Sequence, residues 1–431
     1  MADVLVCASS ITGHVAPMLA IASHLRDAGH AVRMTTGSRF GDRVSGTGVE
    51  FIPLEGGADI DDSRLDEIFP GRAGTSGLAA VRFDVSHLFV GTMRPQWATL
   101  SAELQRRPAD VVIYEGAFTG IAPLLAGSAP RPPVIGVGVI PLTLSSPHVP
   151  PFGPGLRYAE GRAARLRNRM LNLLIEKVVL RQQQREAQAA VGDCVPGARL
   201  SGYFMNGLRV VDVFMELSVA SLDYPRPDLP PNIRYAGPVL PRASSTAQLP
   251  GWWAELDGSR PVVLVTQGTV DTRDLDRLLG PTVRGLAGED VMVVAVTGGP
   301  PVERLGPLPA NVRAATLIPF DLLMSKVSLM VTNGGFGGVH FALAHDVPLV
   351  VAGNTEDKPE VAARVEWAGV AVSLRTGTPS ADQVRDAVRG VLSNESYRAR
   401  AHSIGEDIRR SDALGAIAAE VDARTTMTGR S

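Results

Sequence analysis

Short apolar, β-rich runs alternate with helical segments along most of this chain, and this alternation constrains its fold more than any other feature. The run "DVLVCAS" (residues 3–9) has the composition of a buried strand. The segment "APMLAIASHLRDAG" that follows reads as a helix, because Pro17 suits a helix start and Gly29 a helix end. "AVRMTTG" is the next strand, and "DVVIYE" and "PVIGVGV" come later. Strand–helix–strand units of this kind build a parallel sheet.

A second series of strands begins after a change in texture. Between residues 218 and 252 proline and polar residues dominate and the periodicity is lost, which indicates an interdomain linker. The later strands are "PVVLVTQG", "VMVVAVTGG", "VRAAT", "LMVTN", "VPLVVAG" and "VAVSL". We therefore predict an α/β fold with two doubly wound, Rossmann-like halves that face each other across a cleft. Ligands are expected there, at the carboxyl ends of the strands.

The length supports this division, since 431 residues exceed what one hydrophobic core usually supports. We place an N-terminal domain at residues 1–217, a linker at 218–250 and a C-terminal domain at 251–431. Packing of the last helix back on the N-terminal domain is left open.

Composition and charge exclude several classes of function. The formal net charge of -2 gives no electrostatic footprint for nucleic acid or an anionic membrane. No run of about 18 apolar residues is present, so we expect no membrane span. The N-terminus lacks the basic start of a signal peptide, and two cysteines are too few for a disulfide framework. These features favour a cytoplasmic protein.

Four glycines within five residues open a predicted helix in "VTNGGFGGVHFALAH" (residues 331–345). Glycine in a helix costs about 1 kcal/mol relative to alanine, so the cluster needs a reason. The unpaired N–H groups at a helix start make an anion site, and glycines let a phosphate reach the main chain. Close helix–strand packing is the alternative, but it explains one or two glycines rather than four. Because a G-K-[ST] ending is absent, we expect a phosphate or diphosphate site that is not a P-loop.

Three stretches of the chain resemble one known family. They are "SSITGHVAPMLAIASHLRDAGHAV", "VLVTQGT" and "VTNGGFGGVHFALAHDVPLVVAGNTEDKPEVAARVEWAGVAV". On these motifs the chain resembles the family 1, UDP-dependent glycosyltransferases of the GT-B fold, especially the bacterial enzymes that glycosylate natural products. The resemblance runs nearly from end to end.

In that family a His-Gly-Gly-x-Gly-[ST] segment binds the nucleotide diphosphate. The resemblance places Asn333 at the His position, where an uncharged amide can still donate to phosphate. It assigns four glycines to the diphosphate: Gly334, Gly335, Gly337 and Gly338. The family's ribose-binding Glu is replaced by Phe341, and His340 beside it is either a substitute or a packed histidine.

The resemblance also locates the nucleobase and the sugar. In "TLIPFDLL" the place of the family's base-stacking Trp is taken by Leu317 or Ile318, and we assign Ile318 to the donor site. A UDP-sugar is favoured, with dTDP-sugars left open. The family's sugar-binding Asp-Gln pair matches Asp357 and Lys358, with Glu356 assisting. A solvated surface loop is the alternative for this charged segment.

Two further turns are expected at the donor site. Gln267, Gly268 and Thr269 follow a strand and should face the same cleft, with the Thr269 hydroxyl on the phosphate side. Gly13 is assigned to the donor site as well. The D-x-D sequences at residues 59–61 and 274–276 are too short to be specific, and we predict no metal and no cofactor apart from the nucleotide-sugar co-substrate.

His14 lies between the first strand and its helix, in the setting G-H-x-x-P. The resemblance makes it the general base, and a neutral imidazole can accept a proton at cellular pH. Such a base works best when its other ring nitrogen donates to a carboxylate. Glu115, which ends "DVVIYE", is the nearest match for that partner. A histidine that only caps the helix and a solvated carboxylate are the alternatives.

The acceptor is expected to contact loops of the first half, above all "PLTLSSPHVPPFGPGLRY" (residues 141–158), together with "FPGRAGTSG" and "HLFVGTMRPQW". The resemblance implies an inverting, metal-independent transfer of a hexose to a hydroxyl of a hydrophobic molecule such as a polyketide, macrolide or flavonoid. Two other functions stay open: an epimerase of the same fold, and a non-catalytic nucleotide-sugar binder or auxiliary subunit. A homodimer is also left open.

Overall fold

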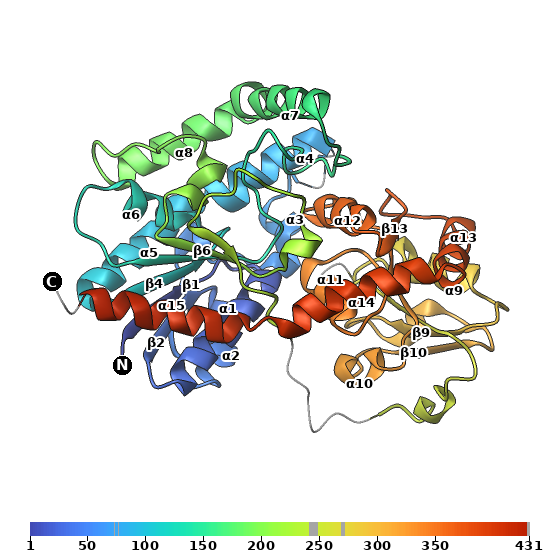
Figure 1. Ribbon diagram of the computed structural model, residues 1–431. Helices are drawn as coiled ribbons and strands as arrows, with labels where there is room; N and C mark the ends of the chain where they lie inside the picture. Colours follow the sequence, from blue (N-terminus) through green and yellow to red (C-terminus); the bar gives the residue numbers. More distant parts are fainter. Residues whose placement is uncertain (73, 76, 241–248, 269–271, 429–431) are drawn as a thin grey trace.

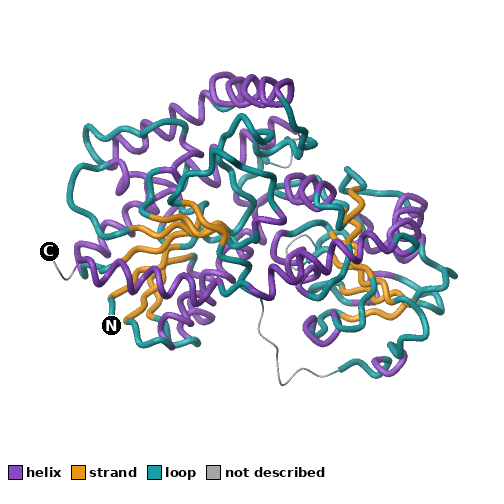
Figure 2. The backbone as a smooth tube through the Cα atoms, viewed as in Figure 1, coloured by secondary structure: helices purple, strands orange, loops and turns teal. Residues whose placement is uncertain are grey.

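The computed structural model describes residues 1–72, 74–75, 77–240, 249–268 and 272–428. Two parallel sheets, each flanked by helices on both faces, form the two halves of the molecule (Figure 1; Figure 2). The predicted class, two doubly wound α/β halves, is confirmed.

The N-terminal half is built on a seven-stranded sheet of order β3-β2-β1-β4-β5-β6-β7. Its strands are β1 (Asp3–Cys7), β2 (Ala31–Thr36), β3 (Glu50–Pro53), β4 (Val111–Glu115), β5 (Val134–Gly138), β6 (Val213–Glu216) and β7 (Ile233–Tyr235). Its helices are α1 (Thr12–Asp27), α2 (Gly41–Ser45), α3 (Leu65–Ile68), α4 (Gly77–Asp84), α5 (Met93–Arg106), α6 (Ala122–Ala126), α7 (Arg162–Leu174) and α8 (Arg181–Cys194). Two π-helical segments adjoin them, Val85–Val90 after α4 and Ile175–Val179 after α7.

The C-terminal half is built on a six-stranded sheet of order β10-β9-β8-β11-β12-β13. Its strands are β8 (Val262–Thr266), β9 (Met292–Val296), β10 (Val312–Ala315), β11 (Leu329–Thr332), β12 (Leu349–Val351) and β13 (Ala371–Ser373). Its helices are α9 (Leu279–Gly285), α10 (Phe320–Met324), α11 (Phe336–Ala344), α12 (Lys358–Trp367), α13 (Ala381–Leu392) and α14 (Glu395–Arg410). A final helix, α15 (Ala413–Thr428), ends the chain.

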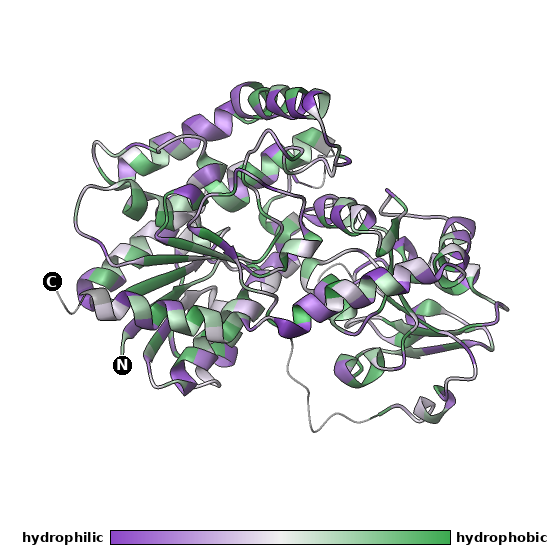
Figure 3. Cartoon of the chain, in the orientation of Figure 1, coloured by the Kyte–Doolittle hydropathy of each residue, from purple (hydrophilic) through white to green (hydrophobic). Residues whose placement is uncertain are grey.

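Both sheets are apolar on both faces, as parallel sheets covered by helices must be (Figure 3). In β1, Val4 and Val6 pack in one cluster with α1, whereas Leu5 and Cys7 pack in another with Leu100 of α5. This arrangement leaves the carboxyl ends of the strands as the place for polar side chains.

The segment 218–250, predicted as a linker, is not a linker throughout. Its residues 233–235 form β7, which extends the N-terminal sheet by pairing with β6 in the register Phe214↔Ile233. A three-residue strand flanked by prolines is too short to show alternation, so the sequence pattern conceals it. The chain leaves the N-terminal sheet only after Tyr235.

The last helix lies on the N-terminal half although the chain reaches it from the C-terminal half (Figure 1). Ile417 and Val421 of α15 are buried in the same cluster as Val15 and Met18 of α1. The two halves are therefore joined by two crossings of the chain.

Candidate active site

His14 and Glu115 form a hydrogen-bonded pair at the carboxyl end of the N-terminal sheet. His14 lies in the first turn of α1, directly after β1, and Glu115 ends the neighbouring strand β4. The His14 Nδ1 atom lies 2.7 Å from Glu115 Oε2, at the distance of a charge-assisted hydrogen bond. The Glu115 side chain is fully buried, whereas that of His14 keeps 13% of its surface exposed.

Glu115 is held as a carboxylate by three donors. Its Oε1 accepts from the Ser9 N–H at 2.9 Å, and its Oε2 accepts from the Ala117 N–H at 2.7 Å as well as from His14. Burial acts to raise the pKa of Glu115, but His14 and these N–H groups outweigh it and lower the pKa. A carboxylate fixed in this way orients the imidazole, since Nδ1 must carry the proton and Nε2 is left as the acceptor.

The pKa of His14 is raised above its ordinary value. Burial acts to lower it, but the carboxylate of Glu115 and, beyond it, the charges of Asp357 and Glu356 outweigh this effect. Asp357 and Glu356 belong to the C-terminal half, in the turn between β12 and α12. The candidate base and the candidate sugar contacts therefore influence each other across the two halves.

The glycine cluster opens α11, as the sequence predicts, and the anion site there stays a prediction. Gly335 is the N-cap, and no side chain caps this helix start. A Cβ at Gly334 would lie 2.7 Å from Val351 Cγ1, and its φ of +88° favours glycine, so fold geometry explains this residue. A Cβ at Gly337 would meet no atom within 4 Å, and one at Gly338 would meet only Met330 Cε, at 3.8 Å. Packing thus does not account for Gly337 and Gly338, which are both exposed.

Asn333 and Gln267 hold the two turns together instead of pointing outward. The Asn333 Nδ2 donates to the Gln267 carbonyl at 2.7 Å, inside the protein. Gln267 Oε1 accepts from the N–H groups of Leu278 and Leu279, at 3.2 and 3.1 Å, and its Nε2 donates to Asp274 O. The Gln267 side chain is nearly fully buried and anchors the start of α9, and the donor contact assigned to Gln267 stays a prediction.

At the predicted nucleobase position two neighbouring side chains differ in exposure, and the assignment of a base contact stays a prediction. Ile318, assigned to the donor site, is buried in the main core of the C-terminal half. Leu317 is the side chain exposed at this place, with 69% of its surface accessible. Gly13 lies in the first turn of α1, after β1 of the N-terminal sheet, whereas Gly268 follows β8 of the C-terminal sheet with a φ of +76°. Thr269 lies outside the described residues.

The charged turn before α12 contains an internal ion pair. The Lys358 ammonium group pairs with the Glu356 carboxylate and lies 3.4 Å from Thr355 Oγ1. Burial, partly offset by Lys358, raises the pKa of the half-buried Asp357. Lys358 is thus a buried cation, and the neighbouring Asp357 carboxylate can accept hydrogen bonds from sugar hydroxyls.

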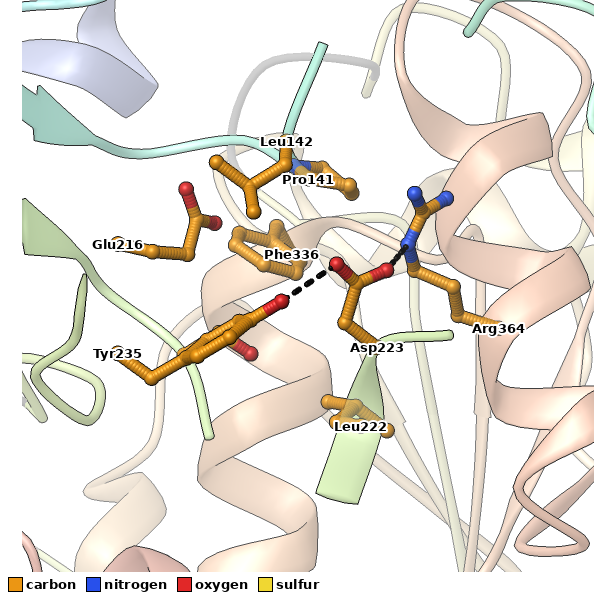
Figure 4. Close-up of a pocket in the computed structure, with 9 residues that line it drawn as sticks. Pro141, Leu142, Glu216, Leu222, Asp223, Tyr235, Phe336 and Arg364 are labelled. Carbon is orange, nitrogen blue, oxygen red and sulfur yellow. Dashed lines mark hydrogen bonds and ion pairs between the residues drawn. The ribbon is translucent and has the colours of Figure 1, made fainter. Parts of the chain in front are cut away.

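Buried charges between the halves were missed by the sequence analysis. Arg364 of α12 donates from Nε to Asp223 Oδ1 at 2.8 Å, and Asp223 Oδ2 accepts from the Tyr235 hydroxyl at 2.7 Å (Figure 4). Glu360, one turn before Arg364, pairs with it at 2.8 Å. The i, i+4 spacing of opposite charges was the available signal, but such pairs usually lie on a solvated face.

His340 is a packed histidine. Its Nε2 lies 2.9 Å from Ser218 Oγ and its Nδ1 2.8 Å from the Phe336 carbonyl. Burial lowers its pKa to about 4, so it stays neutral and links α11 to the segment that follows β6. A role at the ribose is not supported by this position.

Among the described residues, no group of three or more His, Cys, Asp or Glu side chains is arranged to hold a metal ion. Within the same residues, every helix is too short or too polar to cross a bilayer.

Comparisons with known proteins agree on one class. A family model described as "Erythromycin biosynthesis protein CIII-like, C-terminal domain" matches residues 283–421, and one described as "Glycosyltransferase family 28 N-terminal domain" matches residues 10–99. The chain is 40% identical over 414 residues to 4'-demethylrebeccamycin synthase of Lentzea aerocolonigenes, covering 96% of this chain and 97% of that protein. It is 34% identical over 444 residues to UDP-glycosyltransferase 2 of Phaeomoniella chlamydospora, covering 97% and 95%.

The fold agrees with these matches. The crystal structure of CalG4, the calicheamicin glycosyltransferase, superposes with a TM-score of 0.73 at 21% identity and covers 98% of both chains.

Proposed function

This chain belongs to the GT-B glycosyltransferases that act on natural products and small molecules, and on that premise we propose an inverting, metal-independent O-glycosyltransferase. It moves a hexose from a nucleoside diphosphate sugar to a hydroxyl of a hydrophobic acceptor such as a polyketide, macrolide or flavonoid. The observation that carries the proposal is the pair of His14 and Glu115, with Nδ1 and Oε2 2.7 Å apart.

In the proposed reaction the Nε2 atom of His14 removes the proton of the acceptor hydroxyl as its oxygen attacks the anomeric carbon. The bond from that carbon to the diphosphate oxygen breaks on the opposite face, so the configuration inverts. Glu115 stabilises the imidazolium that forms, because it is already a carboxylate in contact with Nδ1. Proton transfer accompanies attack, since an imidazole cannot deprotonate an alcohol beforehand.

The departing diphosphate carries the developing negative charge. In this proposal the N–H groups at the start of α11 receive it, and the exposed Gly337 and Gly338 leave the main chain accessible. These preorganised donors supply the stabilisation that a metal ion supplies in other transferases, which is why the proposed reaction proceeds without one.

For the donor, a UDP-sugar is favoured, and dTDP-sugars are tested beside it. Several similar proteins are named as UDP-dependent transferases. The aliphatic Leu317 at the nucleobase position offers an apolar contact but no aromatic ring for stacking.

The test is a matrix of UDP- and dTDP-sugars against a panel of aglycones, read by the mass shift of the acceptor with and without EDTA. Transfer that survives EDTA and gives the inverted anomer by NMR supports the proposal. Conversion of the sugar nucleotide without any acceptor would indicate an epimerase. Tight donor binding in calorimetry, with no nucleotide released by any acceptor, would indicate a binding or auxiliary subunit.

A further inference from the structure

The loop at residues 141–158, hereafter the acceptor loop, is bound to the helix that follows the candidate sugar contacts. The N–H groups of Gly153 and Gly155 both donate to the same atom, Glu360 Oε1, each at 2.8 Å. Glu360 lies in the first turn of α12 and is almost fully buried. One carboxylate oxygen in the C-terminal half therefore accepts hydrogen bonds from two main-chain N–H groups of the N-terminal half.

Two neighbouring contacts follow the same path. A Cβ at Gly155 would lie 2.4 Å from Pro359 O, so the loop passes directly over the residue before Glu360. Further along, the ring of Tyr158 meets the ring of Trp367 edge-on, with the centroids 5.6 Å apart. The loop thus follows α12 from its first turn to its last residue.

The second carboxylate oxygen of Glu360 also accepts a hydrogen bond from a side chain. Its Oε2 accepts from Arg364 Nη1 at 2.8 Å, and Arg364 Nε donates to Asp223 Oδ1 at 2.8 Å. The three side chains are each about 95% buried or more. The orientation of Glu360 is therefore set by a buried chain of charges rather than by solvent.

We propose that Glu360 is a positioning residue that sets the acceptor loop against the sugar-binding turn. This inference rests on the proposed function. Asp357 and Lys358 immediately precede Pro359 and Glu360, so the helix start that carries the sugar contacts also carries the anchor of the acceptor loop. Displacing the loop would move the acceptor hydroxyl relative to the anomeric carbon, and reaction rates depend steeply on that distance.

The chemistry of the site separates two substitutions. In Glu360→Ala both loop N–H groups and Arg364 lose their partner. In Glu360→Gln the amide oxygen can still accept from Gly153 and Gly155, but its NH₂ group faces the Arg364 guanidinium, since both groups are donors. Glu360→Gln should therefore retain more of the loop position than Glu360→Ala.

The kinetic test measures how the sugar is partitioned between acceptor and water. We expect Glu360→Ala to raise the acceptor KM about tenfold and to increase the share of free sugar released, while the donor KM changes by less than about threefold. Glu360→Gln should fall between Glu360→Ala and the wild type. A helix that is merely destabilised would lower Tm without changing this partition.

Glu103→Ala is the matched control. Glu103 of α5 is also a buried glutamate, and it forms ion pairs with Arg33 and Arg106, each at 2.8 Å. It lies in the N-terminal half, near the strand starts. It should lower Tm and leave the partition of sugar unchanged.

Hydrogen exchange of the peptide spanning residues 150–158 gives a readout that does not need activity. The amides of Gly153 and Gly155 should exchange slowly in the wild type and at least about tenfold faster in Glu360→Ala. If Glu360→Ala does not fold, the same comparison is made with Glu360→Gln, where a smaller acceleration is expected.

Two outcomes would contradict these proposals, and the experiments distinguish them. Transfer by the wild type with the same acceptor KM and the same free-sugar share in the Glu360 variants overturns the positioning role alone. Absence of transfer by the wild type across the donor and acceptor matrix overturns the proposed function.

Discussion

At the scale of single residues, the candidate base gives the sharpest prediction. His14→Ala removes the group that accepts the hydroxyl proton in the proposed reaction, so transfer should fall by about 10²- to 10⁴-fold. Donor affinity, measured by calorimetry, should change far less than the rate of transfer, because His14 bonds to Glu115 and not to the helix start of α11. His24→Ala, on the same helix α1, is the control and should retain full transfer. Equal loss in both variants would contradict the assignment.

Glu115 should control the pH dependence of transfer. His14 must be neutral to act, so the rate falls as the pH drops through the raised pKa of His14. Glu115→Gln removes the main charge that raises this pKa, so the acid limb of the kcat/KM profile should move to lower pH. The maximal rate should fall as well, because the imidazolium loses its carboxylate. An acid limb that stays in place would show that His14 is not the titrating group.

The residue scale also shows what a sequence can predict about a site. The pairing of His14 with Glu115 was predicted through the family resemblance. It agrees with a parallel sheet, because Glu115 ends β4 and His14 follows the neighbouring strand β1, which places both at the carboxyl ends of the strands. The direction of a side chain at such an end was not predictable. Gln267 turns inward to the start of α9, and Ile318 turns into the core while Leu317 faces outward.

At the scale of elements, a glycine substitution at the start of α11 should affect helix stability and donor binding in opposite directions. In Gly337→Ala the added Cβ meets no atom within 4 Å, and alanine replaces a glycine inside the helix. The substitution should therefore raise the free energy of unfolding by up to about 1 kcal/mol. It should weaken donor binding, since the added methyl group covers the accessible main chain. Gly390→Ala in α13 is matched, because a Cβ there also meets nothing within 4 Å. It should raise Tm without affecting the donor Kd, and a Gly337→Ala variant that binds the donor normally would contradict the anion site.

Helix α7 shows why periodicity alone does not place an element. The sequence of α7 is rich in arginine and leucine, and the apolar face of such a helix is usually buried. In the structure Leu166 and Met170 are exposed, whereas Asn168 is buried. Asn168 Nδ2 donates to Pro147 O at 3.2 Å, so the polar face docks on the acceptor loop. The pattern gives the period, and tertiary hydrogen bonds decide which face turns inward.

At the scale of the whole molecule, two halves were predictable but their junction was not. Two series of strands separated by a proline-rich stretch indicate two sheets. The contacts that set one sheet against the other join residues far apart in sequence, such as Asp223 with Arg364 and Gly153 with Glu360. No local pattern marks these pairs, because each partner alone looks like an ordinary polar or turn residue.

The buried Glu216 at this junction should make the stability of the fold depend on pH. It ends β6, lines the cavity shown in Figure 4 with only 1% of its surface exposed, and neither carboxyl oxygen has a hydrogen-bond partner in the described part of the chain. Burial, reinforced by Asp223 and only partly offset by Arg364, raises its pKa well above the ordinary value. The neutral acid therefore stabilises the fold at low pH, and this contribution is lost as the pH rises through the raised pKa.

A permanently neutral side chain should remove that loss. We expect Glu216→Gln to increase the free energy of unfolding by roughly 1–3 kcal/mol at pH 8, and to have no effect near pH 4, where Glu216 is already protonated. Denaturant unfolding at the two pH values measures this difference. Glu103→Gln is the control with the opposite sign, because Glu103 is paired with Arg33 and Arg106 and should lose stability at pH 8. If Glu216→Gln were also destabilising at pH 8, the carboxylate would have to be paired, and the junction would contain one more ionic contact than the structure shows.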